Sequence, residues 1–230
     1  MFTAYEIIIR IVKIYSALFA KAVVHGCFPL PAGAKIIAAN HTIVSDGLQL
    51  PLAIKEKLHF LVQADLFTLP ILGRLMHRAG QIPVEQEEDK PYMAIKHASR
   101  LLRNGKTIVV FPEGRLVPPG ERLPAHNGAI RLALQTGAPI IPVGMYTPPN
   151  LVTPISIQRL GKKRTGLWQT SGWCHLNFGA PWIPRSSAHN KEQIPMLTEE
   201  LMNKIYTLVA ETKKELACVS SALLKPTPQL

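Results

Sequence analysis

Hydrophobic and polar positions along the chain follow two patterns in turn, which predict strands and helices. Short continuous apolar runs, typical of buried strands, occupy residues 34–39, 58–62, 106–110 and 138–144. Apolar residues at helical spacing predict helices over residues 48–54, 90–103 and 128–136. Strands and helices in this order imply a mainly parallel sheet. We therefore expect an α/β fold whose mainly parallel sheet is covered by helices on both faces.

Weaker patterns complete the chain between and after these elements. Residues 66–76 are apolar but broken by proline and glycine, so we expect short helices there, and residues 80–84 resemble a short strand. Residues 147–170 are rich in proline and basic residues and predict an exposed loop. Residues 173–178 alternate like an edge strand, and apolar residues at helical spacing over 197–209 predict a C-terminal helix.

The N-terminal segment has a pattern that fits two structures. Over residues 3–25 a helix would carry a broad apolar face, with Arg10 and Lys13 outside its densest part. Such a helix could lie in a membrane interface with its basic side chains on lipid phosphates, or it could pack on the protein's own core. We expect an amphipathic membrane-associating helical segment over residues 1–28, a main domain over 29–220 and a flexible tail over 221–230.

Neither the apolar runs nor the cysteines indicate export or a transmembrane helix. No uncharged apolar stretch reaches the length of about 18 residues that a spanning helix needs. Residues 20–22 resemble a signal-peptidase site, but Glu6, Arg10 and Lys13 interrupt the region that would have to be apolar, so we expect an unprocessed protein. The three cysteines are far apart, which indicates reduced thiols in a cytosolic setting and neither a disulfide framework nor a metal site.

Composition narrows the possible partners. The 230 residues are 47% hydrophobic, which is enough for one large domain with a sizeable core. The net charge of +11 indicates an anionic partner, for which nucleic acid, an anionic membrane surface and a phosphorylated substrate all qualify. Aromatic residues make up only 7%, and no nucleic-acid-binding signature is present, so we expect no nucleic acid as a partner.

Two charged clusters are prominent within this composition. The acidic residues 85–89 predict a solvated loop in which Asp89 caps the following helix. A basic group fits either a solvated surface or a contact with lipid or an anionic cofactor, and the sequence leaves both open. It consists of Arg159, Lys162, Lys163 and Arg164.

The segment 40–47 carries the first candidate chemistry. It lies between the predicted strand 34–39 and a helix, so His41 and Asp46 share a strand-to-helix loop at the edge where α/β sheets bind ligands. Asp46 could hold one ring nitrogen of His41 and leave the other free to take a proton from a hydroxyl. The same spacing also fits a loop histidine beside a helix-capping aspartate.

Two further segments complete a set of three. Phe111-Pro112-Glu113-Gly114-Arg115 follows a predicted strand, and Ala138-Pro139-Ile140-Ile141-Pro142-Val143 lies in one. In order and approximate spacing, the three segments resemble the glycerolipid acyltransferase family, whose best-known members acylate lysophosphatidic acid. The resemblance implies an acyltransferase domain over residues 29–220 that transfers a fatty acyl group from acyl-CoA or an acyl carrier protein (acyl-ACP) to a glycerol hydroxyl. It implies no permanently bound cofactor and no metal.

The resemblance also assigns the chemical roles. His41 matches the general base that deprotonates the acceptor hydroxyl, and Asp46 matches the residue that orients His41. No protein nucleophile is needed, because a thioester is already activated. The oxyanion of the tetrahedral intermediate needs hydrogen-bond donors, and from their position in the chain, rather than from the resemblance, we expect backbone N–H groups near Gly47 or Gly114 to supply them.

Substrate binding is assigned in the same way. Arg115 would clamp the phosphate of the acceptor, because its guanidinium is planar, always charged and bidentate. Glu113 would accept hydrogen bonds from glycerol hydroxyls or position basic groups. The remaining substrate-binding residues expected from the motifs are Asn40, Gly114 and Pro142.

The chain departs from the family's pattern where positive charge is expected. The second motif of the family ends in an Arg soon after a segment like 80–84, but Glu85 follows here. His126 and Asn127 replace a basic residue that is common before the glycine of a later helix, and no Thr separates the Gly and Arg of residues 114–115. Two positive charges near the expected phosphate are therefore missing or weakened, unless Arg74 or Arg78 compensates.

These departures leave the acceptor lipid open. We expect lysophosphatidic acid, giving phosphatidic acid, with a glycolipid, an ornithine-type lipid or another lysolipid as alternatives. A non-catalytic lipid-binding protein of the same fold is a further alternative. The expected partners are an anionic membrane surface, acyl-CoA or acyl carrier protein, and the lysophospholipid. We expect a peripheral or monotopic protein on the cytoplasmic face of the cell membrane.

Overall fold

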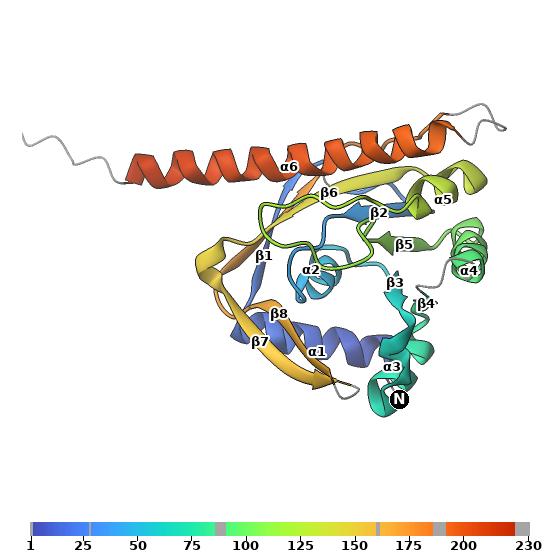
Figure 1. Ribbon diagram of the computed structural model, residues 1–230, viewed down its shortest axis with the longest axis horizontal. Coiled ribbons are helices and arrows are strands. Elements are labelled where there is room, and N and C mark those ends of the chain that lie inside the picture. Colours follow the sequence, from blue (N-terminus) through green and yellow to red (C-terminus); the bar gives the residue numbers. More distant parts are fainter. Residues whose placement is uncertain (1, 28, 86–90, 160–161, 186–191, 224–230) are drawn as a thin grey trace, which may run out of the picture.

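The computed structural model describes residues 2–27, 29–85, 91–159, 162–185 and 192–223. Its centre is a seven-stranded sheet (Figure 1). The strands are β1 (Lys21–Gly26), β2 (Lys35–Ala39), β3 (Leu58–Gln63), β4 (Ile82–Val84), β5 (Thr107–Val110), β6 (Ile140–Tyr146) and β9 (Trp173–Phe178), in the spatial order β1-β9-β6-β2-β5-β3-β4. The strands from β6 to β4 are parallel, whereas β9 is antiparallel to β6 and β1 is parallel to β9.

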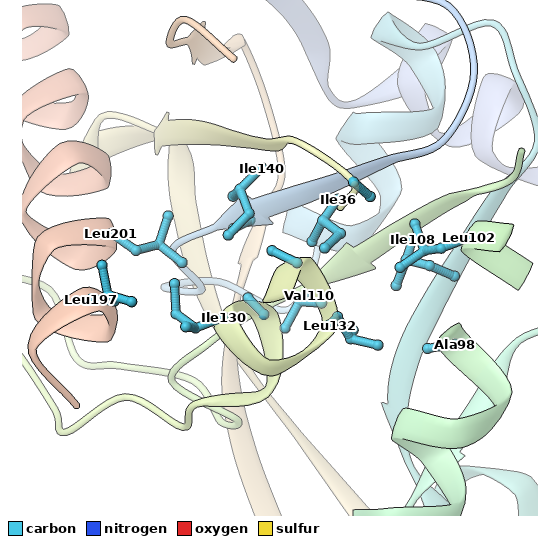
Figure 2. Close-up of a cluster of buried hydrophobic side chains, with 14 of the residues drawn as sticks. Ile36, Ala98, Leu102, Ile108, Val110, Ile130, Leu132, Ile140, Leu197 and Leu201 are labelled. Atoms are coloured by element: carbon cyan, nitrogen blue, oxygen red, sulfur yellow. The ribbon is translucent and has the colours of Figure 1, made fainter. Parts of the chain in front are cut away.

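Helices cover both faces of this sheet. They are α1 (Ala4–Leu18), α2 (Asp46–Ala53), α3 (Pro70–Ala79), α4 (Pro91–Arg103), α5 (Gly128–Thr136) and α6 (Gln193–Leu223), with 3-10 turns η1 (Ala64–Thr68) and η2 (Pro149–Leu151). Side chains such as Ile36, Ile108 and Ile140 pack against α4, α5 and α6 (Figure 2). Their strand neighbours Ile37 and Val109 face the opposite way, toward α2, because side chains alternate along a strand. The predicted α/β architecture is confirmed.

The expected N-terminal helix is present over the first part of its range, and the second part forms a strand instead. Thr3 and Glu6 form a capping box that starts α1, but the helix ends at Leu18. Residues 21–26 form β1 at the edge of the main sheet, paired with β9. The β-branched pair Val23 and Val24 favours a strand at this point. The sheet therefore begins at Lys21, before the expected boundary at residue 29.

The segment 147–170 is also more regular than predicted. It forms an antiparallel hairpin of β7 (Val152–Arg159) and β8 (Lys162–Gln169), separate from the main sheet. The sequence obscured this hairpin because Pro154 and the basic residues suggested a loop, although proline is tolerated on strands with a free edge. The strand over 173–178 is not at an edge, since β9 lies between β6 and β1.

Other expected elements agree closely with the structure. Strands β2, β3, β5 and β6 and helix α5 lie where the apolar patterns predicted them. Most of the acidic run, including Asp89, falls outside the described residues. Helix α6 continues to Leu223, and the rest of the expected tail also falls outside them. Among the described helices, none has the length and apolarity needed to cross a bilayer.

Candidate active site

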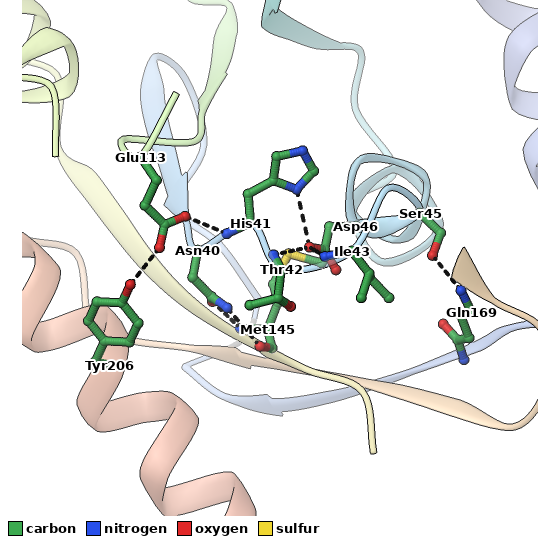
Figure 3. Close-up of polar contacts among 10 residues, drawn as sticks. All are labelled: Asn40, His41, Thr42, Ile43, Ser45, Asp46, Glu113, Met145, Gln169 and Tyr206. Carbon is green, nitrogen blue, oxygen red and sulfur yellow. Dashed lines mark hydrogen bonds and ion pairs between the residues drawn. The ribbon is translucent and has the colours of Figure 1, made fainter. Parts of the chain in front are cut away.

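The segment 40–47 leaves the carboxyl end of β2 and enters α2 (Figure 3). Asn40 fixes its start: the side-chain amide donates to the Met145 carbonyl at 3.0 Å, and its Oδ1 accepts from the Met145 amide at 2.7 Å. Asn40 is only 1% exposed. In this structure it therefore anchors the loop to β6, and its role in substrate binding remains a prediction.

His41 and Asp46 meet inside this loop. Asp46 Oδ2 lies 3.2 Å from His41 Nδ1 and also accepts from the amides of Thr42 at 2.8 Å and Ile43 at 2.9 Å. Asp46 is 1% exposed and occupies the first turn of α2, where a helix favours negative charge. With its Nδ1–H directed at Asp46, His41 presents Nε2 as a proton acceptor. The sequence-based pairing of these residues agrees with this geometry, and their catalytic roles remain predictions.

The orientation of His41 depends on further contacts. Its ring stacks on Phe111, with ring centroids 4.2 Å apart and planes inclined by 17°. Its carbonyl oxygen accepts from the Val117 amide at 2.8 Å. Sequence reasoning assigned no role to Phe111, although an aromatic residue directly before Pro-Glu-Gly was visible. The imidazole is thus held both at Nδ1 and across one face.

Glu113 connects the loop to the long C-terminal helix. Its Oε2 accepts from the His41 amide and its Oε1 from the Tyr206 hydroxyl, each at 2.6 Å. Burial raises the pKa of Glu113, although these two hydrogen bonds oppose the rise. Burial and the neighbouring Glu113 also raise the pKa of Tyr206. Glu113 was expected to accept hydrogen bonds from glycerol hydroxyls or to position basic groups; here its two oxygens accept from the His41 amide and the Tyr206 hydroxyl.

The remaining expected substrate residues lie in different settings. Gly114 adopts a φ of 66°, and a Cβ there would lie 2.7 Å from the His126 ring, so the turn requires glycine. Arg115 follows it and is exposed. Pro142 lies inside β6, buried and paired with Ala38, and so belongs to the sheet. The sequence did not predict that Tyr206 bonds to Glu113. Tyr206 is 93 positions from Glu113 and resembles an ordinary core residue of a helix.

Sequence comparison with the family placed an Arg soon after residues 80–84, and this position lies near the Gly114 turn. Val84 at the end of β4 pairs with Gln63 at the end of β3. The Gln63 side chain donates to the Gly114 carbonyl at 3.3 Å. Residue 85, which directly follows Val84, is therefore at the same edge of the sheet, and it is a glutamate. Arg74 and Arg78 are exposed on α3.

Comparison with known proteins adds independent evidence. The chain is 27% identical over 208 residues to 1-acyl-sn-glycerol-3-phosphate acyltransferase of Bacillus subtilis, covering 89% of this chain and 96% of that protein. It is 26% identical over 128 residues to the chloroplastic 1-acyl-sn-glycerol-3-phosphate acyltransferase BAT2 of Brassica napus, covering 54% of this chain and only 37% of that protein.

A solved structure and a family model agree with these matches. The crystal structure of the 1-acyl-sn-glycerophosphate (LPA) acyltransferase PlsC from Thermotoga maritima superposes with a TM-score of 0.65 at 25% identity, covering 91% of this chain and 79% of that one. The Acyltransferase family model matches residues 21–146, which include the loop of His41 and Asp46 and the turn at Glu113. Since this match spans more than half of the chain, the protein belongs to the acyltransferase family.

Proposed function

We propose that this protein transfers a fatty acyl group from an acyl-CoA or acyl-ACP thioester to a hydroxyl of a lysophospholipid. The observation that carries the proposal is the buried Asp46 carboxylate bonded to His41 Nδ1 at the carboxyl edge of a parallel sheet. The names of the Bacillus subtilis and Thermotoga maritima relatives support 1-acylglycerol 3-phosphate as the acceptor. The product would then be phosphatidic acid.

The proposed reaction uses His41 as the only proton carrier. Its Nε2 accepts the proton of the acceptor hydroxyl as the oxygen attacks the thioester carbonyl carbon, and Asp46 stabilises the imidazolium. When the tetrahedral intermediate collapses, the C–S bond breaks and the departing thiolate takes the proton from Nε2. An ester and a free thiol result, so no covalent intermediate on the protein is required.

The oxyanion of that intermediate needs hydrogen-bond donors. Of the two amides considered from the sequence, that of Gly114 donates to the Phe111 carbonyl at 3.0 Å. Gly47 lies in the first turn of α2, where backbone N–H groups have no partner within the helix. We therefore assign the oxyanion to Gly47 in this proposal.

Arg115 is the proposed partner of the acceptor's phosphate. It is exposed beside the Gly114 turn, and the position of a second family Arg holds Glu85. A charge-assisted contact contributes about 1.5–3 kcal/mol, so Arg115→Ala should raise the KM for lysophosphatidic acid roughly 10–150-fold with little change in kcat. Arg131→Ala, which removes an exposed arginine of α5, is the matched control.

The experiment that tests the function is an acyl-transfer assay with several lysolipid acceptors and both thioester donors. The proposal predicts transfer to lysophosphatidic acid that depends on Arg115. Equal transfer to lysolipids without a phosphomonoester, unaffected by Arg115→Ala, would favour the alternative acceptors. No transfer to any acceptor from either donor would favour the non-catalytic lipid-binding alternative.

A membrane location follows from helix α1. Its outer face exposes a stripe in which Ile7 is 40%, Ile11 56%, Ile14 61% and Leu18 68% exposed. Helix α3 packs against α1 and exposes Ile71 to 85%. Such a stripe on a protein with a net charge of +11 supports binding to an anionic membrane surface. We propose a peripheral or monotopic location on the cytoplasmic face of the cell membrane.

A further inference from the structure

We propose that Tyr15 and Ser45 are positioning residues that join helix α1 to the loop of His41 and Asp46 through the backbone of Gln169. This inference rests on the proposed roles of His41 and Asp46. It makes α1, the helix with the exposed apolar stripe, a structural support of the proposed catalytic loop.

Hydrogen bonds connect the three residues in sequence. The Tyr15 hydroxyl donates to the Gln169 carbonyl oxygen, and the Gln169 amide donates to Ser45 Oγ at 3.1 Å. Burial raises the pKa of Tyr15, while a hydrogen bond with the Ser45 side chain opposes that rise. Ser45 is the N-cap residue of α2 and directly precedes Asp46. A displacement of Ser45 therefore moves the carboxylate that orients His41.

Gln169 is held firmly enough to serve as the connection. It is 0% exposed, and its side-chain amide donates to the carbonyls of Ser171 and Gly172, each at 3.2 Å. Its Oε1 accepts from Gln49 of α2 at 3.0 Å. A fully buried polar group with several partners is costly to displace. The end of strand β8 is thus fixed to α1, to α2 and to the turn before β9.

The β7–β8 hairpin also contacts the loop at Val44, the residue before Ser45. The Val44 amide donates to the Leu167 carbonyl at 2.8 Å. A Cβ on Gly166 would lie 2.5 Å from Val44 Cγ2, so a side chain at position 166 would force Val44 or the hairpin to shift. Figure 3 shows Ser45 and Gln169 joined on the side of the loop opposite Glu113. The loop is therefore supported from both sides, by Glu113 and by the hairpin.

Tyr15→Phe is the main test, because it removes the hydroxyl and keeps the ring. Tyr5→Phe is a matched control on the same helix: its hydroxyl also binds backbone, donating to the Glu56 carbonyl and accepting from the Leu58 amide, but contacts no loop residue. We expect Tyr15→Phe to lower kcat about 3–10-fold with KM and vesicle binding unchanged, and Tyr5→Phe to leave kcat within about twofold.

Hydrogen–deuterium exchange supplies a readout that does not need activity. Amides of residues 42–46 should exchange about 3–10-fold faster in Tyr15→Phe than in the wild type, with exchange in β5 unchanged and no such effect in Tyr5→Phe. Ser45→Ala should act on the same amides, and the double variant with Tyr15→Phe should be no worse than the more severe single variant.

Two results would overturn the inference. One is that Tyr15→Phe and Tyr5→Phe change kcat and loop exchange equally. The other is that the effects of Tyr15→Phe and Ser45→Ala on exchange are fully additive, which would mean that the residues act separately. If the wild type transferred no acyl group, the proposed function would fail, yet the exchange comparison would still decide whether Tyr15 positions the loop.

Discussion

At the scale of single residues, one carboxylate oxygen organises the proposed catalytic loop. Asp46 Oδ2 accepts from the amides of Thr42 and Ile43 and from the His41 ring. The residue that orients the proposed base therefore also folds the loop that presents it. His41 differs from Asp46 in that its side chain is partly exposed, and the hydrogen bond of its backbone amide does not depend on its ring. Replacing His41 thus separates chemistry from folding, which replacing Asp46 does not.

Glu113 gives a prediction for stability against pH. Burial raises its pKa above the ordinary 4.5, so between that value and the raised pKa the folded state keeps a proton that the unfolded chain has released. The contribution of Glu113 to stability is therefore fully present below about 4.5 and is lost as pH rises through the raised pKa. We expect the unfolding free energy of the wild type, relative to Glu113→Gln, to fall as pH rises through this window.

Urea unfolding of both proteins at a series of pH values measures this difference. Gln is nearly the same size as Glu and can bond both the His41 amide and the Tyr206 hydroxyl, so it removes the titration with little change in packing. Glu121→Gln, at an exposed position, should show a flat difference. A flat or rising difference for Glu113→Gln would contradict the assigned burial.

The residues that sequence predicted best are close together along the chain. His41 and Asp46 are five positions apart in one strand-to-helix loop, so their contact followed from local geometry. Tyr206 is 93 positions from Glu113, and no local pattern distinguishes it from a core residue. Asn40 and Pro142 were expected to bind substrate because they belong to the motifs; the Asn40 side chain bonds to β6 and Pro142 lies within β6, and substrate binding by either residue remains a prediction. A residue's place in a motif did not tell whether its side chain contacts the substrate or supports the loop.

At the scale of elements, α1 both packs on the protein and exposes an apolar stripe. Val12 is its only buried residue, and the stripe from Ile7 to Leu18 faces outward. The packing on the protein that the sequence allowed is therefore present on one face of α1, and the membrane contact stays a prediction for the exposed face. A truncation of residues 1–25 would also remove most of the edge strand β1, so point substitutions test membrane binding more cleanly.

We expect Ile11→Ser/Ile14→Ser to weaken binding to anionic vesicles at least tenfold, since each substitution removes about 1.5–3 kcal/mol of apolar burial in the interface. Co-sedimentation with vesicles measures the change. Tyr92→Ser/Met93→Ser, on the exposed face of α4, is the matched control, and it should sediment like the wild type. Equal sedimentation of both double variants would place the membrane contact elsewhere.

The contact between β6 and α6 gives a prediction for packing. A Cβ on Gly144 would lie 2.6 Å from the Val209 amide nitrogen and 2.7 Å from Leu208 Cβ, so Gly144→Ala must push α6 away from the sheet. We expect a loss of about 1–3 kcal/mol in unfolding free energy, measured by urea denaturation.

Gly128→Ala is the control for that measurement. A Cβ there meets only Ile95 Cδ1 at an ordinary 3.6 Å, at the first residue of α5. Alanine should be neutral or stabilising by up to about 1 kcal/mol, because it is the better helix former. If Gly144→Ala were as stable as Gly128→Ala, α6 would not pack on β6 as closely as described.

The helices and strands that were predicted well are those whose apolar pattern fits only one type of secondary structure. A continuous apolar run such as 34–39 fits a strand buried on both faces, and β2 is such a strand. The strand β1 was missed because residues 21–26 continue the apolar pattern of a preceding helix, so only the pairing with β9 reveals its state. The order of strands in a sheet also depends on tertiary contacts. For this reason the sequence wrongly predicted that residues 173–178 form an edge strand, whereas β9 lies between β6 and β1. A local sequence pattern predicts whether a segment is a helix or a strand more readily than it predicts which strands lie beside it.

At the scale of the whole molecule, the loop 40–47 is a meeting point for distant parts of the chain. It is bonded to β6 through Asn40, to the turn after β5 through Glu113, and to the β7–β8 hairpin through Val44. Tyr206 extends this network to α6, and Tyr15 extends it to α1. Helix α1, the hairpin and the long C-terminal helix therefore all support one short segment.

The central claim is that His41 is the general base of acyl transfer. The direct measurement is the rate of acyl transfer to lysophosphatidic acid on vesicles by His41→Ala, with His97→Ala on the exposed face of α4 as the control. We predict that His41→Ala loses at least about 100-fold in kcat while its urea unfolding and vesicle binding match the wild type, and that His97→Ala keeps full activity. Turnover by folded His41→Ala at the wild-type rate would contradict the claim.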